Sequence, residues 1–208
     1  QQRSQQMVAQ TVNAFVRAIE AVDTYLRGQS AFTAQLAVAL ADGLGRNDAE
    51  TLATLRTAAN LSHVGMIQLP KELLTKTGAL SDEERALLKK HVGFAREALA
   101  DIDFGLPVLE AITQMYERLD GSGYPAGRTN GAICEHARIL AVANTFCALV
   151  RPRSYREAHD TDDALKILSE TPPKYDLSVV NALRVFLTTE PGRAFMAQLL
   201  ADQQPNSA

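Results

Sequence analysis

The sequence predicts an all-α fold. Ala and Leu are abundant, aromatic residues make up only 6% of the chain, and no alternation of β-branched residues persists. Helix-start signals also recur ahead of apolar stretches, as in Ser81-Asp82-Glu83-Glu84, where Ser and the Glu three residues later have the spacing of a capping box. We therefore expect a helical bundle without a sheet.

The first predicted helix carries an apolar seam over residues 8–26. Its members follow one another at alternating steps of four and three residues: Val8, Val12, Phe15, Ile19, Val22 and Leu26. This a/d spacing is typical of a coiled coil. We interpret residues 1–27 as a connector helix that forms a homodimer, with an amphipathic helix lying on its own domain as the alternative.

Caps and breakers divide residues 28–200 into further helices of one domain. We expect helices over residues 34–44, 49–63, 71–77, 82–100, 108–119, 136–150, 162–169, 177–188 and 191–200. Asn47 with Glu50 three residues later predicts the second of these starts, and Asp162 and Asp163 predict a later one. Pro and Gly residues mark the breaks. The polar tail, residues 201–208, is expected to fray.

Composition and charge exclude several classes of protein. The chain has 208 residues, is 46% hydrophobic and has a formal net charge of −3, so it has enough apolar residues for a core. The slightly acidic balance argues against a general nucleic-acid binder.

Cys134 and Cys147 are not in a CxxC pair, so no cysteine metal site is predicted and a reduced, cytoplasmic setting is expected. No apolar run is long enough to span a bilayer. A chain that begins with Gln1 is expected to be part of a longer protein, and whether a membrane anchor precedes it stays open.

The most specific motif is ERLDGSGYPAG at residues 117–127, with ARILAVANTFCALV following at residues 137–150. Together with DTYLRGQS, the long stretch LSHVGMIQLPKELLTKTGALSDEERALLKKH, SYREA and YDLSVVNAL, these motifs resemble the HD-GYP family of the HD superfamily over residues 23–187. The resemblance implies an all-helical HD-type bundle. It also implies hydrolysis of cyclic di-GMP at a centre of two or three iron or manganese ions, which would stabilise phosphate charge and activate water.

In its first part, this chain differs from the family's pattern of metal ligands. Gln29 stands after Gly28, where the family has a His, and Ser62-His63 replaces the family's His-Asp pair. Met66 replaces a Lys that normally follows. His63 therefore stands where the family has a carboxylate.

The second half departs as well. His91 is retained as a family ligand, but Met115-Tyr116 replaces the family's His-His pair and Asn144 replaces its last Asp. Neutral amides, a hydroxyl and a thioether are poor ligands for iron or manganese. We therefore expect no metal centre and no cofactor, with His63 and His91 as the residual candidates for a single adventitious metal.

Ser62 and His63 could also be considered as a nucleophile and its base. Adjacent residues on a helix point about 100° apart and do not face each other, so this pairing is not expected. A general acid and base pair of Tyr116 with His63 is no better supported.

The loop signature itself is intact, with Glu117, Arg118, Asp120, Gly121, Ser122, Gly123, Tyr124 and Pro125 all present. In the family this loop lies near the nucleotide site and is proposed to contact GGDEF diguanylate cyclases. An exposed Tyr with Arg and Asp nearby is a reasonable contact surface. The alternative is that the loop is retained for structural reasons.

These observations leave three hypotheses for function. The first is a catalytically degenerate HD-GYP module that acts as a regulatory or interaction domain in bacterial cyclic di-GMP signalling. The second is a sensor that binds cyclic di-GMP without hydrolysing it, with Arg118, Arg153 or Arg156 on the phosphates. An active phosphodiesterase with an unusual metal site ranks last.

Overall fold

The computed structural model describes residues 28–151 and 157–202, preceded by isolated residues of the N-terminal segment: Gln10, Ala14, Val16, Arg17, Ala18, Ala21 and Leu26. The described residues form helices joined by turns and loops, without a β-strand, which confirms the all-α prediction. Several residues named above lie outside the described residues, namely Val8, Val12, Phe15, Ile19, Val22, Arg153 and Arg156.

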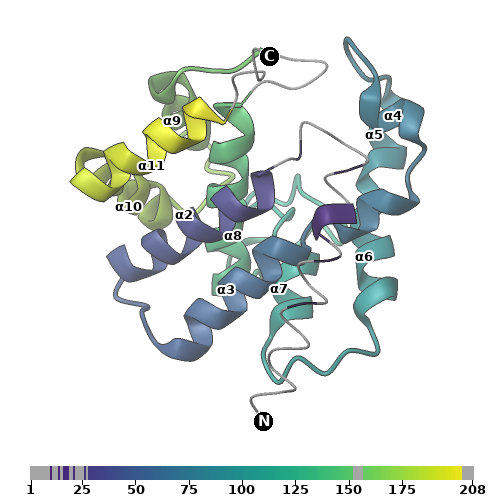
Figure 1. Cartoon of the computed structure of the whole chain (residues 1–208), viewed down its shortest axis with the longest axis horizontal. Helices are drawn as coiled ribbons and strands as arrows, with labels where there is room; N and C mark the ends of the chain where they lie inside the picture. Colours follow the sequence, from purple (N-terminus) through teal and green to yellow (C-terminus); the bar gives the residue numbers. More distant parts are fainter. Residues whose placement is uncertain are drawn as a thin grey trace.

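The helices follow one another along the chain as α2 (Gln29–Gly43), α3 (Ala49–Leu61), η2 (Val64–Gln68), α4 (Lys71–Thr75), α5 (Asp82–Lys89), α6 (His91–Leu99), α7 (Val108–Gln114), η3 (Asn130–Ala132), α8 (Glu135–Leu149), α9 (Thr161–Leu168), α10 (Leu177–Thr188) and α11 (Glu190–Ala201). Helices α4, α5 and α6 lie on one side of α2, α3 and α8, and α9, α10 and α11 lie on the other (Figure 1).

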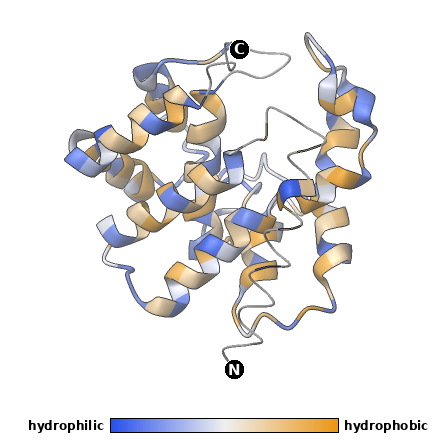
Figure 2. Ribbon diagram, in the orientation of Figure 1, coloured by the Kyte–Doolittle hydropathy of each residue, from blue (hydrophilic) through white to orange (hydrophobic). Residues whose placement is uncertain are grey.

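Helix α8, expected over residues 136–150, is the central helix of the bundle. It contacts α2, α3, α7, α9 and α10, and Leu140 and Phe146 are fully buried on it. Hydrophobic and hydrophilic residues are mixed along the surrounding helices (Figure 2), as expected for helices that bury one face. The bundle therefore buries most of the segment that contains Asn144, and Asn144 itself is half-buried.

The helix predicted over residues 34–44 begins earlier than expected, and two predicted N-caps lie one or two residues from the observed caps. Helix α2 begins at Gln29 after Gly28, whose φ of 74° suits glycine and which provides no side-chain cap. The N-caps of α3 and α9 are Asp48 and Asp160, whose carboxylates accept the backbone N–H of the third helical residue. The predicted caps at Asn47 and at Asp162-Asp163 were wrong.

The helix predicted over residues 82–100 is two helices that meet at Lys90. Helix α5 has no buried residue, whereas α6 buries His91 and Val92 in its first turn. Helix α6 lies directly against η2, since a Cβ built on Gly65 would be 1.8 Å from the carbonyl oxygen of His91. The capping box of Ser81 and Glu84 is confirmed, with hydrogen bonds in both directions.

Among the described residues, no helix has both the length and the apolarity that a bilayer crossing requires.

Cys147 is fully buried, which raises the pKa of its thiol to about 12, and Cys134 is half-buried. Both are free and pack with the core. Ala201 is helical and Asp202 is bound to Arg151, so the tail expected to fray is ordered at its first residues.

Candidate functional site

The first and last predicted ligand positions bond to each other. Gln29 is the fully buried first residue of α2, and Asn144 lies on α8. The side-chain amide nitrogen of Gln29 lies 3.2 Å from the carbonyl oxygen of Asn144 and 3.2 Å from its side-chain oxygen. The two side-chain amides are therefore hydrogen-bonded to each other and do not both face an open site.

A buried cation completes this contact. Arg151 follows α8, and its side chain is only 7% exposed. Its Nη1 lies 3.4 Å from Oε1 of Gln29, its Nη2 donates to Oδ2 of Asp202 at 2.8 Å, and its guanidinium lies over the Phe32 ring. We name this cluster, Gln29, Asn144, Arg151 and Asp202, the α2–α8 network. It was not predicted because Arg151 is more than 100 residues away from Gln29 in the sequence.

Ser62 and His63 follow the end of α3 at Leu61, and both are buried. Nδ1 of His63 lies 3.2 Å from Oγ of Ser62 and 3.2 Å from Oγ of Ser30. The prediction that the two side chains do not face each other was wrong, because His63 has left the helix, with φ −102° and ψ 6°. Ser62 still is not an activated nucleophile, since its hydroxyl donates to the carbonyl oxygen of Ala59 at 2.8 Å.

His91 is enclosed by aromatic side chains. It is 1% exposed, its ring meets Tyr116 edge-on at 4.7 Å between centroids, and its Nε2 lies 3.5 Å from the hydroxyl of Tyr124. Its Nδ1 has no hydrogen-bond partner among the described residues. Burial lowers the pKa of His91 to about 4, so the ring is neutral at pH 7.

Met115 and Tyr116 follow α7 and are both buried. The ring of Tyr116 stacks on that of Tyr124, with centroids 5.3 Å apart and planes 22° apart. A thioether and a phenol thus stand where the resemblance implies two imidazoles, and they extend an apolar and aromatic cluster around His91.

Glu117 and Arg118 hold the loop rather than face outwards. Glu117 is 2% exposed, and its carboxylate accepts the backbone N–H of Ala126 at 2.7 Å and that of Arg128 at 3.0 Å. Arg118 donates to the carbonyl oxygen of Glu117 at 2.8 Å, and its guanidinium lies over the Tyr175 ring at 4.6 Å. The carboxylate of Glu117 is thus turned to the loop backbone, while a partner or phosphate contact of the half-buried Arg118 stays a prediction.

The rest of the loop is also defined by its own geometry. Oδ1 of Asp120 accepts the hydroxyl of Ser122 at 2.6 Å and its backbone N–H at 3.0 Å, which lowers the pKa of Asp120. Gly121 has φ 81°, and a Cβ on Gly123 would be 2.4 Å from the backbone nitrogen of Arg118. Both glycines are therefore required by the fold of the loop.

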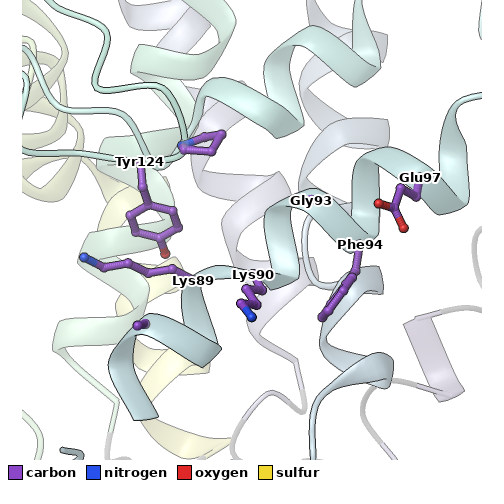
Figure 3. Close-up of a pocket in the computed structure, with 8 residues that line it drawn as sticks. Lys89, Lys90, Gly93, Phe94, Glu97 and Tyr124 are labelled. Carbon is purple, nitrogen blue, oxygen red and sulfur yellow. The ribbon is translucent and has the colours of Figure 1, made fainter. Parts of the chain in front are cut away.

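Tyr124 and Pro125 form one wall of a surface groove. The groove has a volume of about 380 Å³ and is lined by Ala86, Lys89, Lys90, Gly93, Phe94, Glu97, Tyr124 and Pro125. Figure 3 shows Tyr124 reaching from the loop towards Lys89, with Phe94 and Glu97 further along α6. Nζ of Lys89 lies 5.4 Å from the centre of the Tyr124 ring. Tyr124 is half-buried in this setting, not the freely exposed side chain predicted.

The lysines of this groove were missed by the sequence analysis. Lys89 and Lys90 directly precede His91, so the basic pair beside a retained ligand residue was a signal that could have found them. They bring positive charge next to two aromatic rings, a combination suited to a planar anionic ligand.

The residues at the predicted ligand positions do not fit a centre of two or three metal ions. These positions supply two imidazoles together with amides, a hydroxyl, a thioether and a phenol, and no carboxylate to offset the charge of two cations. A divalent cation bound at Gln29 would also lie close to the guanidinium of Arg151. At about 5 Å and an effective dielectric of about 20, the repulsion would be roughly 7 kcal/mol.

Comparison with known proteins places the chain in a family. The sequence model of the HD domain matches residues 6–179. The solved structure of Bd1817, an HD-GYP protein from Bdellovibrio bacteriovorus, superposes with a TM-score of 0.65 at 24% identity, covering 77% of this chain and 52% of that one.

Curated bacterial relatives are named as phosphodiesterases of cyclic dinucleotides. The response regulator RpfG of Xanthomonas campestris, a cyclic di-GMP phosphodiesterase, is 36% identical over 164 residues, which are 76% of this chain and 42% of the relative. A 3'3'-cGAMP-specific phosphodiesterase of Vibrio cholerae is 31% identical over 159 residues, 76% of this chain and 34% of the relative. The chain thus spans less than half the length of these relatives. It belongs to the HD domain family, and its fold is that of an HD-GYP protein.

Proposed function

We propose that this chain is a catalytically inactive HD-GYP module that acts as a regulatory or interaction domain in bacterial cyclic di-GMP signalling. The observation that carries the proposal is the direct bonding of Gln29 to Asn144 with Arg151 against them. Metal-dependent hydrolysis needs imidazoles and carboxylates that converge on open coordination sites. Two amides that hydrogen-bond to each other beside a guanidinium do not offer such coordination sites.

The relatives support the signalling context of the proposal. They are named for cyclic di-GMP and for 3'3'-cGAMP, so the shared chemistry is a cyclic dinucleotide. We further propose that the module works as a homodimer through residues 8–26, with a GGDEF diguanylate cyclase or another signalling protein as its partner. Free cysteines at Cys134 and Cys147 support a cytoplasmic location.

The test is a hydrolysis assay on the purified chain after anaerobic reconstitution with iron(II) or manganese(II). We expect no linear dinucleotide from cyclic di-GMP or 3'3'-cGAMP, while the cyclic di-GMP phosphodiesterase of Thermotoga maritima serves as the positive control. Turnover that requires metal and disappears in a His91→Ala variant would overturn the proposal.

A second candidate function is a sensor that binds a cyclic dinucleotide without hydrolysing it. The observation that favours it is the groove beside the loop, where Lys89 and Lys90 can meet phosphate and Tyr124 and Phe94 can meet a base. Arg118 is already engaged with Tyr175, which argues against its predicted role on a phosphate.

Calorimetry with cyclic di-GMP separates the two functions. A sensor gives a saturable heat that Lys89→Ala with Lys90→Ala removes. The exposed Lys71, at the start of α4, is the control, and Lys71→Ala leaves the heat unchanged. If no heat is measured at high micromolar nucleotide, the sensor function is wrong and the interaction module is the function that remains.

A further inference from the structure

Arg151 is a charged side chain placed against a predicted ligand position. It follows the C-cap of α8, is buried, and contacts Gln29, Phe32 and Asp202. Burying a guanidinium is costly unless it is paired and hydrogen-bonded. Its retention inside the bundle therefore requires the partners it has, a carboxylate, an amide oxygen and an aromatic face.

The partners of Arg151 come from three parts of the chain. Gln29 begins α2, Asp202 follows α11, and Arg151 itself follows α8. Asp202 also packs on the turn before α2, since a Cβ on Gly28 would be 2.9 Å from its Oδ2. The network thus fastens the start of α2 to the ends of α8 and α11.

A metal ion and Arg151 would compete for this site. Gln29 offers one side-chain oxygen, and Arg151 lies within hydrogen-bond distance of it. A guanidinium does not lose its proton at ordinary pH, so its positive charge remains and repels a divalent cation. The same oxygen cannot serve both cations without bringing like charges together in a buried setting.

We infer that the guanidinium of Arg151 supplies, in place of a metal ion, the positive charge that joins α2, α8 and the end of α11. This inference rests on the proposed function, because it gives the physical reason why the bundle is complete without a metal. It identifies Arg151 as a positioning residue whose charge stabilises the fold and excludes divalent cations.

The decisive experiment restores four of the family's ligand residues, with Met115 and Tyr116 unchanged, in the presence and in the absence of Arg151. One variant of the whole chain carries Gln29→His, Ser62→His, His63→Asp and Asn144→Asp, and a second adds Arg151→Ser. Manganese per chain is measured by elemental analysis over a titration. We expect removal of Arg151 to tighten manganese binding at least about tenfold; equal binding by the two variants overturns the inference.

A second measurement covers the case in which the restored variants do not fold. Arg151→Met in the otherwise unaltered chain is expected to lower the melting temperature by about 10 °C, and manganese should not restore it. The matched control is Arg85→Met, because Arg85 pairs with Asp82 on the surface and both side chains are more than half exposed. Equal melting temperatures for Arg151→Met and the unaltered chain contradict the inference, and failure of Arg151→Met alone to fold supports its stabilising charge.

The two proposals fail in different ways. If the unaltered chain binds metal and hydrolyses a cyclic dinucleotide, the proposed function is wrong. If the unaltered chain binds no metal but Arg151 has no effect on manganese binding or on melting, the proposed function stands and the role of Arg151 is wrong.

Discussion

The carboxylate of Glu117 is the clearest place to test why the loop signature is present. It is buried and accepts the backbone N–H of Ala126 and of Arg128. Hydrogen bonds to a charged group contribute about 1.5–3 kcal/mol each. Loss of both in Glu117→Ala should therefore reduce the free energy of unfolding by about 3–6 kcal/mol. Glu117→Gln retains one acceptor and turns an amide N–H towards a backbone donor, so about 2 kcal/mol is expected.

The assay is urea unfolding followed by far-UV circular dichroism, with hydrogen exchange at Ala126 and Arg128. Both amides should exchange faster in Glu117→Gln, because their acceptor is weakened. Glu135→Gln is the control, since Glu135 makes an ion pair with Arg46 that is about half exposed and should contribute less than about 1 kcal/mol. If Glu117→Gln unfolds at the same urea concentration as the unaltered chain, the loop is not held by this carboxylate.

Three further predictions follow from contacts and sequence pattern. Gly65→Ala should destabilise the chain by about 3 kcal/mol or more, because a Cβ would be 1.8 Å from the His91 carbonyl oxygen, while Gly93→Ala, with open space at its Cβ, should stabilise it by about 0.5–1 kcal/mol. Burial lowers the pKa of His91 from 6.5 to about 4, so the unfolded state binds the proton first as the pH falls. Stability should be full above pH 6.5 and fall by about 3 kcal/mol towards pH 4. His91→Gln should remove that slope in urea unfolding at each pH. Polar substitutions in the apolar seam of residues 8–26 should convert a dimer into a monomer, as measured by light scattering. If the unaltered chain is already a monomer, the predicted homodimer is wrong.

Local signals in the sequence were sufficient for most of the fold. The capping box at Ser81 and the apolar run on α8 are short-range patterns, and both appear in the structure as expected. The break at Lys90 was not predictable in this way, because it arises from the close packing of α6 on η2 at Gly65. Helix propensity continues through Lys90, and tertiary contact overrides it.

The candidate site was predictable in its composition but not in its contacts. The motif located Gln29 and Asn144 as altered ligand positions, and the structure shows that they bond to each other. The role of Arg151 depends on contacts with residues distant in sequence, Gln29 and Asp202, and no local pattern indicates it. Glu117 was interpreted as a contact for a partner because its burial against the loop backbone cannot be read from the motif.

The most direct test of the central claim is metal content measured together with hydrolysis on one preparation of the whole chain. After reconstitution with iron(II) or manganese(II) and removal of loosely bound ions, the account predicts essentially no metal per chain and no linear product from cyclic di-GMP. Stoichiometric metal, with turnover that His91→Ala abolishes, would contradict it.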